Sequence, residues 1–146
     1  MATCRCGHVR LRASGRPLVT SACHCTGCRR MTGGPYSLGA IYAANAVVVE
    51  AGETRAIGAD HGAGHQGCPR CASWVFSRPR EVDDIVVVRS PLFEDAAAFP
   101  PFMETCTSDK LPFVDFTAPH RFARFPDPTE FPALIAAYAA WDQVEV

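Results

Sequence analysis

The sequence predicts a mainly β fold of short strands, with one helix at the C-terminal end of the chain. Short runs of β-branched and aromatic residues recur between Gly, Pro, Asn and Asp, and this succession is typical of strands and turns. Only one stretch, near the end, is rich in Ala instead. A third observation is that seven of the eight cysteines fall into three tight groups, which can hold a small β domain together.

Each expected strand follows from its own residue pattern. Residues 8–12 alternate, with Val9 and Leu11 on one face and charged residues on the other, which indicates a half-buried strand. The other expected strands are residues 37–42, 47–49, 74–76 and 85–88. We expect all of these strands to lie in the core, together with the aromatic residues Trp74, Phe76, Phe113 and Phe116.

The C-terminal helix is expected over residues 131–141. Thr129 is the expected N-terminal cap, and Pro132 lies in the first turn, where proline is tolerated. Residues 99–112 contain three prolines. For that segment we expect an ordered loop or a lid over a substrate.

Size and charge exclude several classes of protein. The 146 residues suit one domain, 1–146. A net charge of −1, from 14 Lys and Arg against 15 Asp and Glu, argues against general nucleic-acid binding. The longest apolar runs are too short to cross a membrane. The first residues contain no apolar signal segment, so we expect a cytoplasmic protein with reduced cysteines.

The cysteine spacing indicates metal binding rather than disulfides. The groups are Cys4 and Cys6 (C-x-C), Cys23, Cys25 and Cys28 (C-x-C-x-x-C), and Cys68 and Cys71 (C-x-x-C). Four thiolates satisfy a tetrahedral zinc ion, and short-spaced pairs from two separate segments commonly close such a site. The sequence therefore predicts zinc as the cofactor.

The grouping also predicts how the ligands are shared. Neither cysteine pair can complete a tetrahedron alone, so we expect Cys4, Cys6, Cys68 and Cys71 to form one closed structural zinc site. The triplet of Cys23, Cys25 and Cys28 leaves one position open, as catalytic zinc sites do, and chemistry is expected there. The prediction is two zinc ions per chain.

A longer motif surrounds the triplet. Residues 23–30 read Cys-His-Cys-Thr-Gly-Cys-Arg-Arg, preceded by C-x-C and followed by Cys-Pro-x-Cys at residues 68–71. Residues 32–34, 85–88 and 108–113 add further landmarks in the same order. In these motifs the chain resembles the glutathione-dependent formaldehyde-activating enzymes, a family in the same superfamily as centromere protein V.

The resemblance implies a fold and an activity. The fold is Mss4-like, a complex of short coiled β-sheets held by zinc, with the two metal sites paired as above. The activity is the addition of glutathione to formaldehyde, formally a carbon–sulfur lyase running in reverse. The implied partners are a small thiol such as glutathione and a small aldehyde. The chain departs from the family at Ala72, because the family usually has Gly directly after the second cysteine of the Cys-x-x-Cys motif at residues 68–71. We therefore expect no positive φ at Ala72.

Residues beside the triplet are candidates for further roles. Arg29 and Arg30, like Arg5 beside the first pair, offset the negative charge of metal thiolates or hold a ligand carboxylate. His24 is the nearest group suited to supply a proton to the new hydroxyl, although a residue inside C-x-C usually points away from the metal. Cys106 is a fourth ligand, a pocket thiol or a buried structural residue, and these alternatives stay open.

Two functions follow from these residues. The first is a zinc-dependent carbon–sulfur lyase-type enzyme that adds glutathione or a related thiol to formaldehyde or another small aldehyde. The second is a non-catalytic zinc scaffold that binds glutathione or a protein partner. An exchangeable fourth ligand at the triplet favours the enzyme, whereas closure of the site by Cys106 favours the scaffold.

Overall fold

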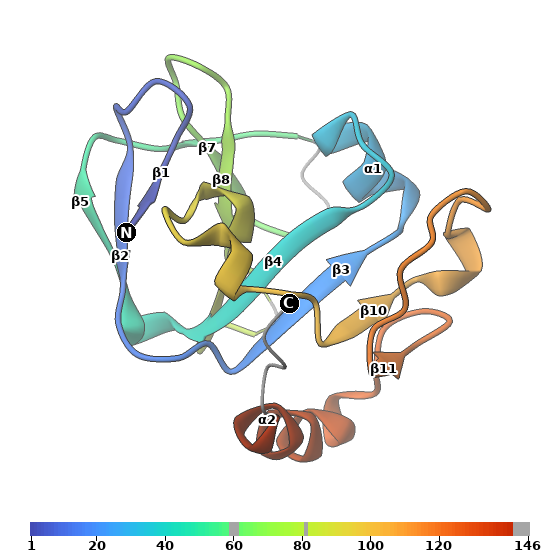
Figure 1. Cartoon of the computed structure of the whole chain (residues 1–146). Helices are drawn as coiled ribbons and strands as arrows, with labels where there is room; N and C mark the ends of the chain where they lie inside the picture. The colour runs from blue at the N-terminus through green and yellow to red at the C-terminus, as the bar shows by residue number, and fades with distance from the viewer. Residues whose placement is uncertain (59–61, 81, 142–146) are drawn as a thin grey trace.

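The computed structural model describes residues 1–58, 62–80 and 82–141, which form two β-sheets and two α-helices (Figure 1). The smaller sheet contains, in spatial order, β1 (Ala2–Thr3), β2 (Arg10–Ala13) and β5 (Val47–Ala51). The larger sheet contains, in spatial order, β11 (His120–Arg121), β10 (Met103–Thr105), β3 (Val19–Cys23), β4 (Ser37–Ala43), β9 (Ile85–Val88), β8 (Trp74–Ser77), β7 (His65–Gly67) and β6 (Arg55–Ala56). The mainly β fold predicted from the sequence is confirmed.

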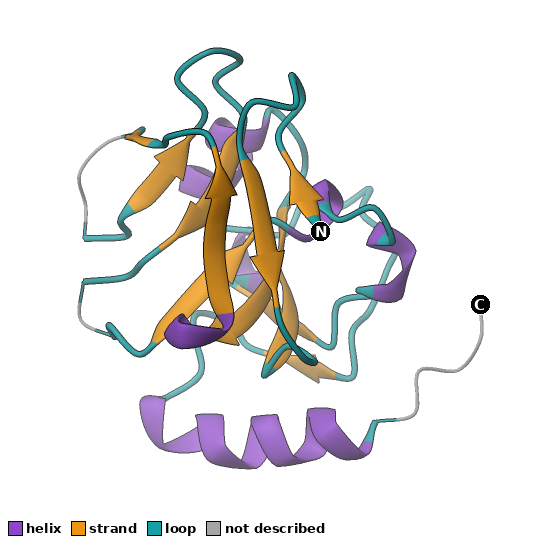
Figure 2. Ribbon diagram, turned by 90° about the vertical axis from the view of Figure 1, so that its left-hand side faces the viewer, coloured by secondary structure: helices purple, strands orange, loops and turns teal. Residues whose placement is uncertain are grey.

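Two α-helices accompany the sheets. Helix α1 (Thr26–Thr32) follows β3, and α2 (Phe131–Ala140) lies along one end of the β structure, away from α1 (Figures 1 and 2). Single turns of 3₁₀ helix are η1 (Ala44–Ala46), η2 (Ser90–Leu92), η3 (Ala96–Ala98), η4 (Thr107–Asp109) and η5 (Pro128–Glu130). No helix in the described ranges is long and apolar enough to span a membrane.

The register of the larger sheet gathers three chain segments at one of its ends. Strands β3 and β4 are antiparallel, with Cys23 opposite Ser37. Strand β10 runs parallel to β3 on its other side, with Thr105 opposite Cys23. Because β3 is paired on both sides, its last residue is held firmly where the chain leaves the sheet and enters α1.

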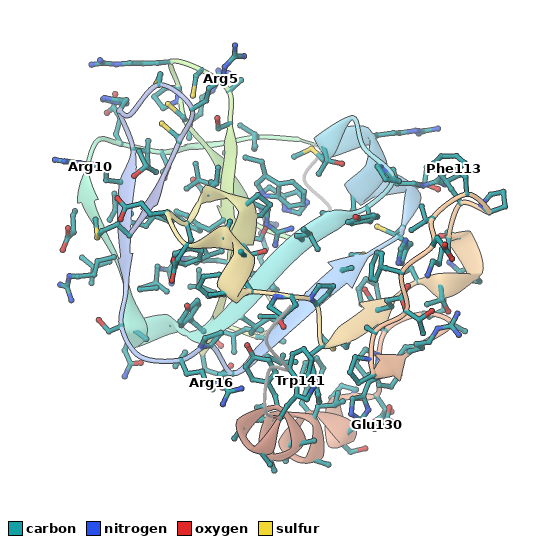
Figure 3. The ribbon with its side chains drawn as sticks, viewed as in Figure 1. Arg5, Arg10, Arg16, Phe113, Glu130 and Trp141 are labelled. Atoms are coloured by element: carbon teal, nitrogen blue, oxygen red, sulfur yellow. The ribbon has the colours of Figure 1, made fainter. Side chains whose placement is uncertain are left out.

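The buried core has two parts. The first joins the two sheets and includes Val9, Leu11, Val75, Val86 and Val88, all fully buried. The second joins the larger sheet to α2 and includes Val19, Ile41, Phe102, Met103, Leu134 and Tyr138. Arg16 fastens the end of α2, because its guanidinium lies 4.6 Å from the centre of the Tyr138 ring and donates hydrogen bonds to the carbonyls of Ala139 and Trp141 (Figure 3).

Sequence reasoning missed β3, α1 and β10. The expectation of a loop or lid over residues 99–112 is wrong for residues 103–105, because β10 lies inside the larger sheet between β3 and β11. Residues 100–102 and 110–112 are ordered loop, as expected. The segment is anchored at its start, where the Phe102 N–H donates to the carbonyl of Thr20 at 3.1 Å. Pairing with a strand far away in sequence therefore overrides the local signal of the prolines.

Three smaller expectations also need correction. Strand β5 lies at a sheet edge, so that Val48 and Val49 are exposed rather than in the core. Trp74 and Phe76 are buried as expected, but Phe113 is 74% exposed. Phe116 is half-buried, and both it and Phe113 belong to the loop after η4. Phe113 therefore contributes to the surface, whereas Phe116 packs against His24.

The cap before α2 is Asp127 and not Thr129. Its carboxylate accepts a hydrogen bond from the Thr129 backbone N–H at 2.9 Å, and the Glu130 carboxylate accepts one from the Asp127 N–H at 2.7 Å. This reciprocal pair is a capping box on η5, which leads directly into α2. The hydrogen bonds from Thr129 hold the pKa of Asp127 below its usual value.

We predict that Asp127→Ala lowers the melting temperature at pH 7. Because the pKa of the carboxyl group is depressed in the folded state, its contribution is present above the ordinary pKa of about 4 and is lost as the pH falls below it. The difference between variant and parent should therefore shrink in acid. Thermal melts followed by circular dichroism, with Asp115→Ala as a control that removes an exposed carboxylate outside any helix, measure this; a constant difference contradicts it.

Candidate metal centre and adjoining groove

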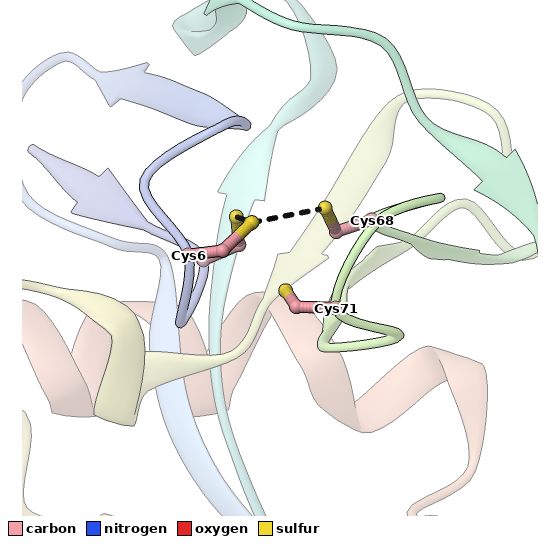
Figure 4. Close-up of side chains that lie close together, drawn as sticks. Cys6, Cys68 and Cys71 are labelled. Carbon is pink, nitrogen blue, oxygen red and sulfur yellow. Dashed lines mark hydrogen bonds between the residues drawn. The ribbon is translucent and has the colours of Figure 1, made fainter.

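The first cysteine cluster lies between the two β-sheets. Cys4 and Cys6 lie in the turn between β1 and β2, and Cys68 and Cys71 lie in the turn between β7 and β8 (Figure 4). The Sγ atoms of Cys4 and Cys6 are 3.7 Å apart, those of Cys6 and Cys68 are 3.8 Å apart, and all four lie within 4.8 Å of one another.

These distances fit a metal ion and not a disulfide. Zinc–sulfur bonds of about 2.3 Å in a tetrahedron separate the sulfurs by roughly 3.8 Å, whereas bonded sulfurs lie about 2.05 Å apart. The Val9 N–H donates to Cys4 Sγ at 3.2 Å, and a hydrogen bond from the Ser73 hydroxyl lowers the pKa of Cys71 to about 5. The cluster could therefore hold zinc through four thiolates.

The Cys68–Cys71 turn contains an unexpected backbone conformation. Ala72 has a φ of 58°, and its N–H donates to the carbonyl of Cys68 at 3.0 Å. The expectation that no positive φ occurs after Cys71 is therefore wrong. The turn that presents both sulfurs to one point requires the left-handed conformation whichever residue occupies the position, and Ala accepts it at a cost.

The second cluster is built where β3 passes into α1. Cys23 ends β3, Cys25 is the residue before α1, and Cys28 lies in the first turn of α1. Their sulfurs lie within 4.8 Å of one another, and the Cys25 sulfur accepts the Cys28 backbone N–H at 3.3 Å, so that it caps the helix. A hydrogen bond from Cys28 lowers the pKa of Cys23 to about 5. This cluster could also hold a metal ion.

Cys106 lies beside this cluster but outside it. The three grouped sulfurs are those of Cys23, Cys25 and Cys28. Cys106 is buried in a left-handed conformation with φ 55°. Burial raises the pKa of its thiol to about 12, and negative charge at Cys23 and Cys25 adds to the rise. The grouping of the sulfurs therefore gives a cluster of three cysteine ligands, with Cys106 outside it.

His24 points into the protein interior. It is fully buried, its Nε2 lies 2.9 Å from the Glu104 carboxylate, and its ring stacks on Phe116. Its Nδ1 has no hydrogen-bond partner among the described residues. The ring is thus held by a buried carboxylate rather than by solvent, and its catalytic role stays a prediction.

Glu104 is a site residue that sequence reasoning missed. It accepts hydrogen bonds from Lys110 Nζ at 2.7 Å and from the Ala118 N–H at 2.9 Å. Burial opposes its ionisation, but these donors outweigh burial and lower its pKa. The Glu104 carboxylate therefore links the loop after η4 to His24. His24 in turn stands between Cys23 and Cys25 in the sequence. The only sequence signal is the placement of an acid within an apolar, Pro-rich stretch.

A groove runs beside α1. Its volume is about 570 Å³, and it is lined by Thr26, Arg29, Arg30, Gly33, Gly34, Pro35, Leu111 and Phe113. One wall is α1 and the segment after it, and the other is the loop that Lys110 anchors. The two arginines predicted to meet a ligand therefore share this groove, whereas Arg5 is exposed beside the first cluster (Figure 3).

Comparison with known protein families matches residues 1–109 to the family described as glutathione-dependent formaldehyde-activating enzyme. The chain belongs to this family. The matched segment contains every cysteine of the formaldehyde-activating enzyme pattern described above. A comparison with curated proteins found no match.

A solved structure adds a likeness in fold. The crystal structure of a Rhodobacter sphaeroides protein, a structural genomics target, superposes with a TM-score of 0.52. It is 21% identical in sequence and covers 64% of this chain and 87% of its own. At this identity the likeness concerns the fold alone, and it agrees with the mainly β architecture.

We predict two zinc ions per chain, to be measured by elemental analysis of protein purified under reducing conditions. Cys71→Ser should lose one ion and most of its folded population, because structural zinc contributes apparent binding free energies of roughly 10 kcal/mol or more in small domains. Cys25→Ser should lose the other ion but keep a cooperative melt. One ion in the parent, or two variants that behave alike, contradicts the pairing.

We also predict that Ala72→Gly raises the free energy of unfolding of the zinc-loaded protein by up to about 1 kcal/mol. The left-handed conformation costs an L-residue roughly 1–2 kcal/mol, and the greater freedom of Gly in the unfolded chain offsets part of the gain. Ala123→Gly, at a position without positive φ, should instead be destabilising. Denaturant titrations measure the free energy of unfolding of both variants and of the parent. If Ala72→Gly is destabilised as Ala123→Gly is, Ala72 is not strained.

Proposed function

We propose that the protein is a zinc-dependent carbon–sulfur lyase-type enzyme that adds glutathione or a related thiol to formaldehyde or another small aldehyde. The observation that carries the proposal is the cluster of three cysteine sulfurs with Cys106 outside it. Three protein ligands leave one position of a tetrahedral zinc ion for exchange, which is the property that separates catalytic from structural sites.

The groove supports glutathione as the thiol. Its volume of about 570 Å³ lies in the range of small-molecule sites, roughly 300–1,000 Å³. Glutathione carries two carboxylates, and the guanidinium groups of Arg29 and Arg30 are suited to bind them. Both arginines and Cys28 belong to α1, so carboxylate recognition and the cysteine cluster are carried by the same helix.

Bound zinc would supply Lewis acidity and stabilise a thiolate near neutral pH. In the addition, the thiol sulfur bonds to the carbonyl carbon, the carbonyl π electrons move to oxygen, and the thiol proton ends on that oxygen. We assign the proton transfer to His24 as the sequence predicts. Glu104 holds Nε2 of the ring, which leaves Nδ1 as the atom without a partner.

The proposal includes the setting of the protein. Residues 1–146 act as one zinc domain, and the protein works in the cytoplasm. There the free thiols of both clusters, together with glutathione, stay reduced.

The central test follows glutathione at a cobalt-substituted second cluster. In the parent, glutathione should change the thiolate-to-cobalt charge-transfer absorption, because a further sulfur enters the fourth position. The parent should also accelerate formation of S-(hydroxymethyl)glutathione above the uncatalysed rate. Cys25→Ser should do neither while its first metal site and its fold persist. A parent with neither response overturns the enzyme and supports the zinc scaffold instead.

We also predict that Arg30 binds a carboxylate of glutathione in the groove beside α1. Arg30→Met should raise the KM for glutathione about tenfold, equivalent to about 1.4 kcal/mol, with a smaller effect on kcat. Arg10→Met is the matched control, because Arg10 is also exposed but lies on β2, across the molecule from α1 (Figure 3). Equal KM values in the two variants contradict carboxylate binding in this groove.

A further inference from the structure

Arg89 is a buried cation that the proposed reaction has not used. It directly follows β9, is only 9% exposed, and lies over the Trp74 ring at 4.1 Å from its centre. Its Nη1 donates to the Ser37 hydroxyl at 3.3 Å and its Nη2 to the carbonyl of Val87 at 3.4 Å. Its Nε has no hydrogen-bond partner among the described residues.

No carboxylate balances this charge in the described part of the chain. The ion pairs there involve other cations, at Arg12, Lys110, Arg121 and Arg124. A buried guanidinium without a counter-charge is costly, since its solvation is lost and nothing replaces it. The Trp74 ring, the Ser37 hydroxyl and the Val87 carbonyl are all neutral, so they do not balance the positive charge. We therefore expect a negative group to lie near Arg89.

The second cluster lies next to Arg89 across Ser37, to which Arg89 donates and which stands opposite Cys23. Thiolates that hold a metal ion there would supply the missing negative charge. Burial lowers the pKa of Arg89 to about 10, so the guanidinium remains charged near neutral pH. Arg89 is buried and far away in the chain from the two groove arginines, of which Arg29 is half-buried and Arg30 exposed.

Ser37 connects the guanidinium with the cluster. It begins β4 directly opposite Cys23 in the antiparallel pair of β3 and β4. Residues opposite one another in such a pair point to the same face of the sheet, so the Ser37 hydroxyl lies beside the Cys23 side chain. The Arg89 guanidinium donates to that hydroxyl. Arg89 and Ser37 therefore lead from the protein interior to the edge of the second cluster.

Strand β4 leaves room for the guanidinium. A Cβ atom at Gly39 would lie 3.0 Å from Arg89 Nη2 and 2.8 Å from Val87 Cγ1. Because Gly39 has no side chain, the Arg89 guanidinium can pack directly against the backbone of β4. The opposite side is closed by Trp74, which is itself held by a hydrogen bond from its Nε1 to Ser77 at 3.1 Å.

We propose that Arg89 is a positioning residue that balances the negative charge of the Cys23, Cys25 and Cys28 centre from its buried side and, through Ser37, holds the end of β3 at Cys23 in place. This inference rests on the proposed function, because three thiolates around Zn²⁺ carry a net charge of −1 and a substrate thiolate makes it −2. A buried, fixed cation stabilises the centre more in the second state than in the first.

The test measures metal affinity without glutathione. Chelator competition against Zn²⁺ and Co²⁺ should show that Arg89→Met weakens the second site about 10- to 100-fold, the usual effect of losing a group that supports metal ligands. The first site in the same protein should not change, which shows that the variant is folded. Arg89→Lys should recover part of the loss. In the cobalt form, the charge-transfer band of Arg89→Met should move to longer wavelength, because the thiolates lose a neighbouring positive charge.

Two further variants complete the test. Ser37→Ala, which removes the hydroxyl that accepts from Arg89 but keeps the charge, should weaken the second site less than Arg89→Met does. Arg16→Met, which removes an arginine from an aromatic ring at the α2 end of the molecule, should leave both sites unchanged. Equal affinities of the second site in Arg89→Met and in the parent overturn the proposal for Arg89.

The proposed function fails separately. If the parent binds two metal ions and Arg89→Met loses the second one, but glutathione changes neither the cobalt spectrum nor the rate, the role of Arg89 stands and the enzymatic proposal falls. If glutathione reacts, but Arg89→Met and the parent bind the second metal ion with equal affinity, the enzymatic proposal stands and the role of Arg89 falls. A parent that binds one metal ion overturns both.

Discussion

The convergence of four cysteine sulfurs from two distant turns is the constraint on which the architecture depends. The Cys4–Cys6 turn belongs to the smaller sheet and the Cys68–Cys71 turn to the larger one. Their sulfurs have the spacing of a metal tetrahedron, not of a disulfide. Strands of two to seven residues bury little apolar surface each. A metal ion held by the four thiolates would cross-link the sheets and compensate for this, and it would make even a strained residue such as Ala72 tolerable.

The second cluster is surrounded by buried charges of both signs. On one side Arg89 donates a hydrogen bond to Ser37, which lies opposite Cys23 in the sheet, and on the other the Glu104 carboxylate holds His24 and Lys110. The larger sheet brings these groups together, because β3, which ends in Cys23, lies between β4 and β10. A fixed electrostatic environment of this kind needs no reorganisation when charge changes at the centre.

The sequence predicts the metal-binding geometry better than the fold around it. Cysteine spacing is local chemistry, so the two clusters could be identified without a structure, as could β4, β8 and β9 from their apolar residues. Strand β3 reads Val-Thr-Ser-Ala-Cys and shows no alternation, because Val19, Thr20 and Ala22 are all fully buried, so that neither face of the strand is turned to water. Helix α1 is short and is capped by a cysteine sulfur, which no propensity scale anticipates. Arg89 and Glu104 depend on partners far away in sequence, and only a charged residue at the end of an apolar strand hinted at Arg89.

The anchoring of the groove's outer wall has a consequence for how such a protein diversifies. One wall, α1, shares its residues with the cysteine cluster and lies in the segment that matches the family. The other wall, with Leu111 and Phe113, follows that segment. Its loop is attached to the Glu104 carboxylate by Lys110 Nζ and by the Ala118 N–H, and the Phe116 ring packs against His24. Substitutions of Leu111 or Phe113 can reshape the groove without disturbing a sulfur or a strand. Ligand choice and metal chemistry are thus separable in this chain, and the buried Glu104 carboxylate and the His24 ring join them.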